Sequence, residues 1–256
     1  MGTLNDKVAI VTGASSGIGR ATAILFARQG AKVVVSARRE AELDRLVGEI
    51  EADGGQAVAV AGDVRSEALA RALVRTALDR FGRLDIAFNN AGIVGEMKPA
   101  PDLSLKAWQD ALETNLTSSF LGAKYQLPAM AQHGSGSLIF TSTFVGHTAG
   151  MPGMAAYAAS KAGLIGLTQV LAAENGPKGI RVNAVLPGGT NTPMAIWNEP
   201  GAGHGVRTFV ESLHALKRVA APEEIARAVA FLASDAASFV TGSAFLVDGG
   251  VSIARA

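Results

Sequence analysis

A tyrosine and a lysine are spaced for proton chemistry in the second half of the chain. Tyr157 and Lys161 lie four residues apart in a stretch of helical pattern over residues 157–174, so both side chains project from one helical face. An ammonium close to a phenol stabilises the phenolate and lowers its pKa from an ordinary value of about 10. The pair therefore predicts a phenol that exchanges a proton with a substrate oxygen near neutral pH. An ordinary exposed tyrosine and lysine would give the same short pattern, so the prediction needs support from elsewhere in the chain.

A glycine-rich turn near the N-terminus gives that support. It follows a β-branched run over residues 8–11, precedes a helical pattern, and reads Thr12-Gly13-Ala14-Ser15-Ser16-Gly17-Ile18-Gly19. A diphosphate needs backbone N–H donors at close range, which glycine allows because it lacks a Cβ, and the N-terminus of the next helix adds partial positive charge. The spacing G-x-x-x-G-x-G differs from the common G-x-G-x-x-G fingerprint, and a plain strand-to-helix turn is the alternative. The strand-then-helix context favours a dinucleotide cradle.

The elements that must position these residues alternate along the chain. Short apolar runs predict strands at residues 8–11, 33–35, 57–61, 84–89, 137–141, 182–186 and 244–247. Helical patterns between them cover residues 17–29, 40–52, 67–81, 105–132, 157–174 and 222–233. This alternation predicts an α/β fold, a single Rossmann-like doubly wound parallel sheet with helices on both faces. We expect residues 1–256 to form one domain, with a substrate lid around residues 188–217, because a long irregular stretch in a compact domain often covers a site.

Composition excludes several other classes of protein. The chain has 256 residues, a formal net charge of +1 and no cysteine. The balanced charge argues against a nucleic-acid or membrane-surface partner, and the absence of cysteine excludes disulfides, thiolate metal sites and a cysteine nucleophile. The histidines show no metal-ligand spacing with acidic residues, so no metal is expected. Neither a membrane span nor a secretory signal is visible, and we predict a soluble, cytoplasmic protein.

Further motifs follow in order along the chain: Asp63-Val64, Asn89-Asn90-Ala91-Gly92, Asn115, Tyr157-Ala158-Ala159-Ser160-Lys161, Arg181-Val182-Asn183, Pro187-Gly188 and Leu246-Val247-Asp248-Gly249-Gly250. With the glycine cradle, they make the sequence resemble the short-chain dehydrogenase/reductase family over essentially its whole length. The resemblance implies a nicotinamide cofactor and hydride transfer between that cofactor and a carbonyl or secondary alcohol. It also implies a homotetramer or homodimer, built on the helices at 105–132 and 157–174 and on the C-terminal segment.

The resemblance assigns a set of cofactor contacts. Asp63 and Val64 would contact the adenine. Lys161 would bind the ribose that carries the nicotinamide, with Tyr157 beside it, and Thr192 would contact the carboxamide. The remaining cofactor-binding residues that it implies are Gly13, Ser15, Ser16, Gly17, Ile18, Gly19, Asn90, Ala91, Gly92, Pro187 and Gly188.

The end of the second strand favours NADP(H). Family members that prefer NAD commonly have an aspartate there for the adenosine ribose, whereas this strand ends in Ala37-Arg38-Arg39. Arg38, together with Arg39, can pair a 2′-phosphate through charge-assisted hydrogen bonds. Two solvated arginines that open a helix are the alternative. We therefore predict a preference for NADP(H), with NAD(H) as the alternative cofactor.

Two catalytic assignments stay open. The family's substrate-binding hydroxyl falls on Ser142 or Thr143, because the spacing to Tyr157 departs from the family pattern; we narrowly favour Ser142. Asn115 would hold, through its backbone carbonyl, a water that connects Lys161 to solvent. A structural role at a local helix kink is the other interpretation of Asn115.

The predicted activity is thus an NADP(H)-preferring oxidoreductase. Apolar residues near Tyr157 and in the lid, among them Phe144, Met194 and Trp197, favour a small apolar ketone or alcohol, although ordinary core packing would explain them too. A 3-oxoacyl-[acyl-carrier-protein] reductase ranks second, because the chain lacks an evident basic docking patch. A non-catalytic NADP(H) sensor would need the cradle but not the Tyr157–Lys161 pair.

Overall fold

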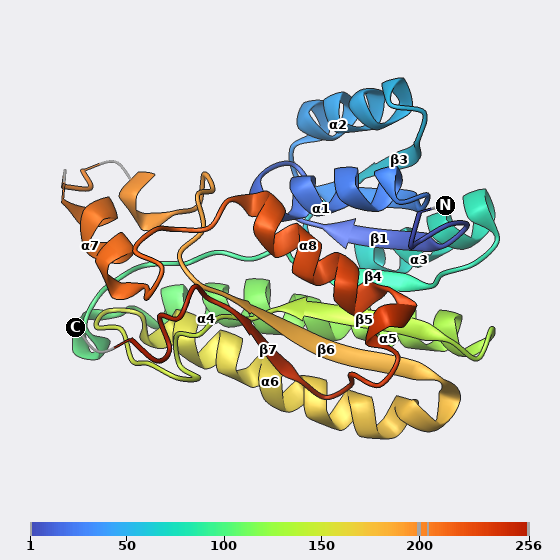
Figure 1. Cartoon of the computed structure of the whole chain (residues 1–256). Coiled ribbons are helices and arrows are strands. Elements are labelled where there is room, and N and C mark those ends of the chain that lie inside the picture. The colour runs from blue at the N-terminus through green and yellow to red at the C-terminus, as the bar shows by residue number, and fades with distance from the viewer. Residues whose placement is uncertain (1, 199–200, 204, 255–256) are drawn as a thin grey trace.

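The computed structural model describes residues 2–198, 201–203 and 205–254. Its centre is a seven-stranded, wholly parallel sheet in the order β3-β2-β1-β4-β5-β6-β7 (Figure 1). The strands are β1 (Val8–Thr12), β2 (Lys32–Ala37), β3 (Gln56–Ala61), β4 (Ile86–Asn89), β5 (Gly136–Thr141), β6 (Ile180–Pro187) and β7 (Ala244–Val247). The predicted doubly wound fold is confirmed.

Helices cover both faces of the sheet (Figure 1). They are α1 (Gly17–Arg28), α2 (Glu40–Ala52), α3 (Glu67–Phe81), α4 (Leu105–Leu112), α5 (Ser118–Ala131), α6 (Ala155–Asn175), α7 (Val206–Leu213) and α8 (Pro222–Ala233). Apolar side chains of α1, α2 and α8 pack on one face of the sheet, and those of α3, α5 and α6 pack on the other. Among the described residues, no helix has the length and apolarity that a bilayer crossing requires.

The first strand shows why the strands are apolar throughout. Ala9 and Val11 belong to the core on the α1 face, whereas Val8 and Ile10 belong to the core on the α3 face. Successive side chains of a strand point to opposite faces, so a strand covered on both sides must be apolar at every position. The sequence pattern of a buried parallel strand is explained by this double cover.

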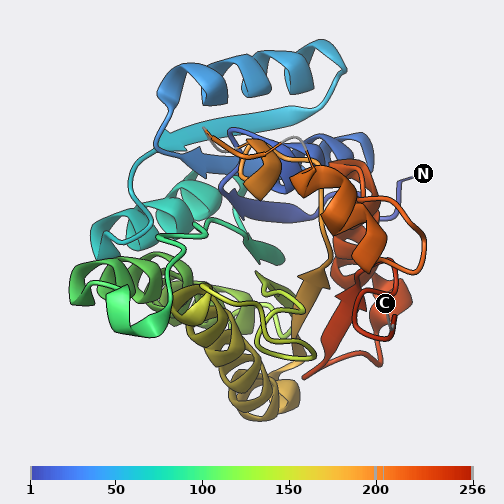
Figure 2. The same cartoon turned by 90° about the vertical axis from the view of Figure 1, so that its left-hand side faces the viewer.

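The strand order reverses at β1, which lies between β2 and β4. In doubly wound sheets ligands bind outside the carboxyl ends of the strands at this reversal. Because the sheet is parallel, the turns that follow its strands all leave it at the carboxyl-terminal edge. Figure 2 views the molecule from the side on which α7 lies. Every predicted strand-end residue of the site is therefore brought to the same edge.

The expected single helix over residues 105–132 is interrupted, and that prediction was wrong. A π-helical turn, Glu113–Thr117, separates α4 from α5. Hydroxyls satisfy carbonyls in and next to this turn, because Ser118 Oγ donates to Thr114 O (2.6 Å) and Ser119 Oγ donates to Asn115 O (3.0 Å). Such side-chain bonds compete with the regular helix ladder, and π turns of this kind occur often at functional sites.

Two turns at the amino-terminal edge of the sheet contain glycines in the left-handed conformation. Gly54 (φ 82°) lies between α2 and β3, and Gly82 (φ 80°) ends α3 before β4. Glycine takes this left-handed conformation without the Cβ penalty that other residues meet. A Cβ at either position would have no neighbouring atom within 4 Å. No predicted site residue lies at this edge.

Candidate active site

The turn after β1 has the shape of an anion cradle. Gly13 (φ 67°) and Gly17 (φ 56°) adopt left-handed conformations, and α1 begins at Gly17. A Cβ on Gly19 would lie 2.4 Å from Gly13 O, so a side chain would close the turn. Ser16, which precedes α1, makes no side-chain cap, and the N–H groups of the first helical turn are donors that a helix cannot satisfy internally. A diphosphate fits these donors and the positive end of the helix.

Asn90 joins the ends of three neighbouring strands. Thr12 Oγ1 accepts from the N–H groups of Asn90 (3.0 Å) and Ala91 (3.2 Å), while Thr141 Oγ1 donates to Asn90 Oδ1 (3.1 Å). A Cβ on Gly92 would lie 2.9 Å from Asn115 Oδ1 and 3.1 Å from Lys161 Nζ. The Asn90–Gly92 turn is thus fixed against β1 and β5 and brought close to the predicted lysine.

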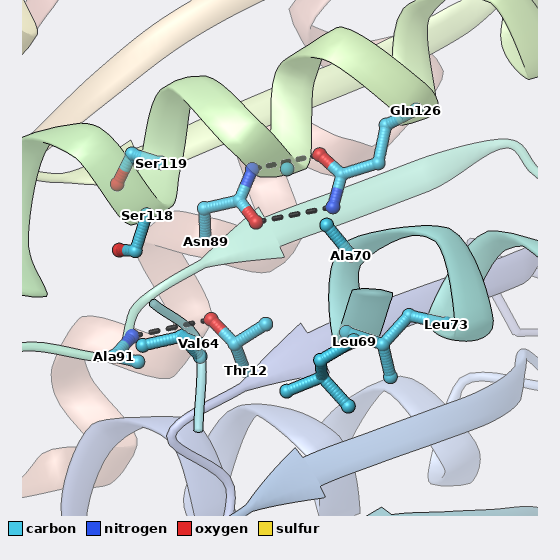
Figure 3. A pocket seen from close by; sticks show the side chains of 11 residues that line it. Thr12, Val64, Leu69, Ala70, Leu73, Asn89, Ala91, Ser118, Ser119 and Gln126 are labelled. Carbon is cyan, nitrogen blue, oxygen red and sulfur yellow. Dashed lines mark hydrogen bonds between the residues drawn. The ribbon is translucent and has the colours of Figure 1, made fainter. Parts of the chain in front are cut away.

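A small cavity lies behind this turn (Figure 3). Its volume of about 20 Å³ suffices for one water molecule, and Val64, Ala91 and Ser119 are among its lining residues. Asn89 and Gln126 close it with a reciprocal pair of amide hydrogen bonds (2.7 and 3.1 Å). Val64, a predicted adenine contact, therefore lines this small cavity.

The two predicted arginines lie at the carboxyl end of β2 and are both exposed. Arg39 Nη2 donates to Ser15 Oγ (2.9 Å) and Ser16 Oγ (3.0 Å), so its guanidinium rests on the cradle. The charge of Arg38 helps to lower the pKa of Asp63. Positive charge therefore flanks the cradle where the sequence predicts a 2′-phosphate.

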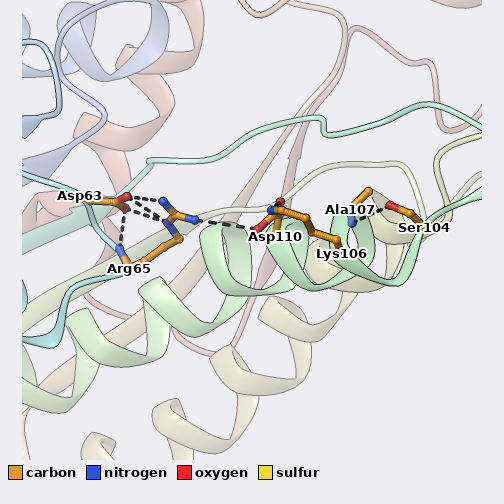
Figure 4. Close-up of polar contacts among 6 residues, drawn as sticks. All are labelled: Asp63, Arg65, Ser104, Lys106, Ala107 and Asp110. Atoms are coloured by element: carbon orange, nitrogen blue, oxygen red, sulfur yellow. Dashed lines mark hydrogen bonds and ion pairs between the residues drawn. The ribbon is translucent and has the colours of Figure 1, made fainter.

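Asp63 is engaged by a residue that the sequence reasoning missed. Arg65 Nη2 lies 2.6 Å from Asp63 Oδ2, and Arg65 Nε also donates to this carboxylate. This hydrogen bonding is the main reason why the pKa of Asp63 falls below its ordinary value. Arg65 Nη1 also lies 4.0 Å from Asp110 Oδ1 on α4, so the guanidinium stands between two acidic groups (Figure 4). The Asp-x-Arg spacing is the signal that could have revealed the pair.

Tyr157 stands in the first turn of α6 beside Thr143. Desolvation raises the pKa of the Tyr157 phenol, and a hydrogen bond with the Thr143 side chain offsets part of that rise. Lys161 was expected to lower the phenol pKa, but it has no part in this shift, and the burial of the phenol is the largest cause in the protein alone. A bound oxidised nicotinamide would bring a positive charge that opposes this cost.

Lys161 is deeply buried at the end of β5. Its side chain is 3% exposed, and Nζ donates to Thr141 O (2.7 Å). Burial lowers the pKa of this ammonium from 10.5 to about 8. The lysine is therefore held in a fixed position close to Gly92, and the burial of its charged form destabilises the folded protein.

The two candidate hydroxyls have different partners. Ser142 Oγ donates to the carbonyl of Lys161 (2.8 Å) and so ties the end of β5 to α6. Thr143 Oγ1 accepts from the N–H of Val145 (3.3 Å), and the Thr143 side chain lowers the pKa of the Tyr157 phenol. Neighbouring residues of extended chain point in opposite directions, which explains this division. The geometry thus runs against our preference for Ser142 and favours Thr143.

Asn115 lies in the π-helical turn and is completely buried. Its side-chain amide donates to Ile93 O (2.9 Å) and to Ser160 Oγ (2.9 Å), and Oδ1 accepts from the N–H of Ile93 (2.8 Å). The backbone carbonyl accepts from Ser119. Asn115 thus joins the turn after β4 to α6 from the helix kink; the water relay stays a prediction.

The segment after β6 lies over the cradle. A Cβ on Gly17 would be 3.1 Å from Thr192 Cγ2, so the predicted carboxamide contact is beside the diphosphate turn. Ile196 and Trp197 are half-buried, whereas Met194 is 45% exposed. Residues 199–200 and 204 of the predicted lid lie outside the described residues. The helix α7 lies within the residues predicted as a lid, and the sequence patterns did not predict it.

Comparison with known proteins decides the family. Residues 13–252 match a family model described as "Enoyl-(Acyl carrier protein) reductase". Curated relatives match at 41–44% identity over nearly their whole length. The chain belongs to the short-chain dehydrogenase/reductase family.

Several members of the short-chain dehydrogenase/reductase family are similar along the whole chain. Cyclohexanol dehydrogenase of Acinetobacter sp. (strain SE19) is 41% identical over 96% of this chain and 94% of its own length. The A-factor type gamma-butyrolactone 1′-reductase (1S-forming) of Streptomyces virginiae is 44% identical over 98% of each chain. The crystal structure of levodione reductase superposes with a TM-score of 0.94 at 35% identity, over 98% of this chain and all of the other.

Membership of the short-chain dehydrogenase/reductase family establishes the class of reaction. The protein is an oxidoreductase that uses a nicotinamide cofactor to transfer hydride between CH–OH and C=O groups. Tyr157, Lys161 and the glycine cradle stand at the edge of the sheet where this chemistry is expected.

Proposed function

We propose that the protein is an NADP(H)-preferring reductase or dehydrogenase of small apolar ketones and secondary alcohols, with cyclic compounds as the first candidates. The observation that carries the proposal is the buried Lys161, which its bond to Thr141 O holds one helical turn after Tyr157, while the Thr143 side chain lowers the pKa of the Tyr157 phenol. These groups follow β5 and begin α6, next to the cradle that follows β1.

The chain's own residues carry the proton chemistry. When bound, the nicotinamide supplies or accepts the hydride. In the reducing direction Tyr157 Oη gives its proton to the substrate oxygen, so that the O–H bond of the phenol breaks as that of the alcohol forms. Thr143 Oγ1 donates a hydrogen bond to the same oxygen and stabilises its developing negative charge. Lys161 holds positive charge near the phenolate that remains.

The cofactor preference is supported by charge at the end of β2. Arg39 already rests on Ser15 and Ser16, so its guanidinium needs little further ordering to meet a 2′-phosphate. A carboxylate that would accept bonds from a 2′-hydroxyl is missing from residues 37–39. Arg38→Ala should weaken NADPH binding far more than NADH binding, measured by the quenching of protein fluorescence. Equal losses would contradict the preference.

The substrate class is supported by the lid and by the relatives. Ile196 and Trp197 give the segment after β6 an apolar character. A cyclohexanol dehydrogenase, a cis-4-hydroxycyclohexanecarboxylate dehydrogenase and a gamma-butyrolactone reductase are among the similar curated proteins, and each name specifies a ring. We carry this substrate class to the present chain as a proposal.

An acyl-carrier-protein substrate is the second candidate. It is favoured by the family model, whose description names an acyl-carrier-protein reductase. The acidic carrier would need a basic surface. Residues 128–137, around the start of β5, offer His133 alone, and Lys178 is the further basic residue that could contribute. The two candidates are separated by comparing cyclohexanone with a 3-oxoacyl thioester as substrates.

Assembly as a homotetramer or homodimer is proposed on the same resemblance. The helices expected at the interfaces expose apolar side chains, namely Phe120 on α5 (49% exposed) and Val170 on α6 (55% exposed). Light scattering of the purified protein tests this proposal.

The central experiment is a panel of ketones and alcohols assayed with NADP(H) and NAD(H), with Tyr157→Phe as the matched variant. We expect turnover of a cyclic substrate by the wild type, and a loss of roughly two to four orders of magnitude in the variant with cofactor affinity retained. Retained turnover in Tyr157→Phe would refute the proton donor. Cofactor binding without any turnover would favour the non-catalytic sensor.

A further inference from the structure

A buried histidine beyond the catalytic groups joins the lid to the sheet. His214 directly follows α7 and is 2% exposed. It has no part in the proton transfer proposed above. Its two ring nitrogens nevertheless both have backbone partners, one in the lid helix and one in the turn after β6.

Those partners fix the tautomer of the ring. The N–H of Gly189 points to Nε2 at 2.9 Å, and Nδ1 lies 2.7 Å from the carbonyl oxygen of Val210 in α7. A backbone N–H can only donate, so Nε2 must be the unprotonated acceptor. Nδ1 then carries the proton and donates to Val210. The neutral imidazole thereby accepts from the turn after β6 and donates to the lid helix.

Three glycines pack closely against the ring. A Cβ on Gly188 would lie 2.8 Å from His214 Nε2, one on Gly189 would lie 2.9 Å from Cε1, and one on Gly249 would lie 3.2 Å from Cδ2. The ring is therefore packed against the backbone of the turn after β6 and of the turn after β7. Side chains larger than hydrogen at these glycines would displace it.

This turn is adjacent to the catalytic strand. β6 pairs with β5, with Val185 opposite Thr141, and the N–H of Ser142 donates to Val185 O (2.9 Å). Gly188 and Gly189 directly follow β6. The turn that His214 contacts therefore follows the strand that is paired with β5, which leads to Ser142 and Thr143.

We propose that His214 is a positioning residue that fastens α7 to the turn after β6 and so sets the width of the substrate cleft. The inference rests on the proposed function in placing the substrate under this segment. The bridge itself rests on the two hydrogen bonds and on the packing of the ring.

Three substitutions separate the two bonds. The Oε1 atom of His214→Gln takes the place of Nε2 and keeps the acceptor for Gly189, whereas His214→Asn keeps a donor near Nδ1 for Val210 and loses the acceptor. His214→Leu keeps most of the volume and loses both bonds. The exposed His133, replaced by leucine, is the matched control.

Hydrogen–deuterium exchange of the cofactor-free protein measures the bridge, and kinetics with cyclohexanone and NADPH measure the cleft. We expect His214→Leu and His214→Asn to lose protection at the Gly189 amide and to raise the KM for cyclohexanone roughly tenfold, the size expected for one buried hydrogen bond. The kcat should change by less than about twofold, because Tyr157 and Thr143 are not touched. His214→Gln should keep wild-type protection at the Gly189 amide but raise the KM as the other two variants do, because it loses the bond to Val210 in α7. The His133→Leu control should retain wild-type protection and KM.

Several results would overturn the proposal. Wild-type protection of Gly189 in His214→Leu would show that the bridge does not hold the turn. An unchanged KM in that variant would show that the bridge does not shape the cleft. A fall of the melting temperature and of kcat in His214→Gln and His214→Leu alike would assign the histidine to folding alone. If the wild type failed to reduce any ketone, the proposed function would fall while the exchange measurement still decided the bridge.

Discussion

Replacing Lys161 with methionine should make the cofactor-free protein more stable and catalytically inactive. Burial lowers the pKa of Lys161 from 10.5 to about 8, and a tenfold change in proton affinity is worth about 1.4 kcal/mol. Burying the protonated side chain therefore costs the folded state about 3 kcal/mol at pH 7. Methionine has a similar length and no charge, but it loses the hydrogen bond to Thr141 O, worth about 1 kcal/mol. The net gain is about 2 kcal/mol.

The higher unfolding free energy of Lys161→Met must disappear at alkaline pH. Between pH 8 and 10.5 the unfolded wild-type chain keeps the proton that the folded protein has released, so wild-type stability rises relative to the variant across this interval. Urea unfolding of both proteins at pH 7 and pH 10.5, without cofactor, gives the difference, because the other titrating groups are shared. Lys106→Met is the control, since this lysine is 82% exposed, and it should alter stability by less than about 0.5 kcal/mol.

A variant less stable than the wild type at pH 7 would refute the claim that Lys161 carries a costly buried charge. A stabilisation of the same size at both pH values would also refute it, because the gain would then come from packing alone. Whatever the change in stability, the activity of Lys161→Met should fall by orders of magnitude if Lys161 serves catalysis. A more stable but inactive variant would fit the general finding that functional sites are often less stable than they could be.

Four further substitutions test other parts of the site and of the segment predicted as a lid. Thr143→Val should lower kcat by roughly a hundredfold, the loss expected for one oxyanion donor, whereas Ser142→Ala should mainly lower the unfolding free energy by about 1 kcal/mol; steady-state kinetics and urea unfolding separate the two. Gly19→Ala should abolish NADPH binding in a fluorescence titration, since its Cβ would lie 2.4 Å from Gly13 O; wild-type affinity would contradict the cradle. Lys217→Gly should raise the unfolding free energy by up to about 1 kcal/mol, because Lys217 holds a φ of 53° that disfavours any Cβ; a lower melting temperature would argue against that strain.

The fold was predictable from the sequence because local and global preferences agree. Runs such as residues 33–35 are apolar and β-branched, as strands covered on both faces must be, and α2 and α8 begin and end where their patterns predict. The cradle was predictable because glycine is required where a Cβ would meet the backbone, as at Gly19. Each of these features is determined by neighbours in the sequence.

The remaining features depend on contacts between distant segments. The interruption before α5 arises where Asn115 bonds with Ile93 and Ser160, and a helical pattern cannot reveal such partners. The choice between Ser142 and Thr143 depends on which hydroxyl is already bonded to the backbone of α6, as that of Ser142 is, so spacing alone could not decide it. The role of His214 depends on Gly189, 25 residues away.

The glycine turns at the amino-terminal edge have a practical consequence for handling the protein. Gly54 and Gly82 adjoin open space, and a fluorophore, an affinity tag or a surface linker attached beside them, for example at the neighbouring Asp53, would point away from the nucleotide cradle and from Tyr157. Enzyme immobilised through this end of the molecule would present its catalytic end to the bulk solution in a uniform orientation.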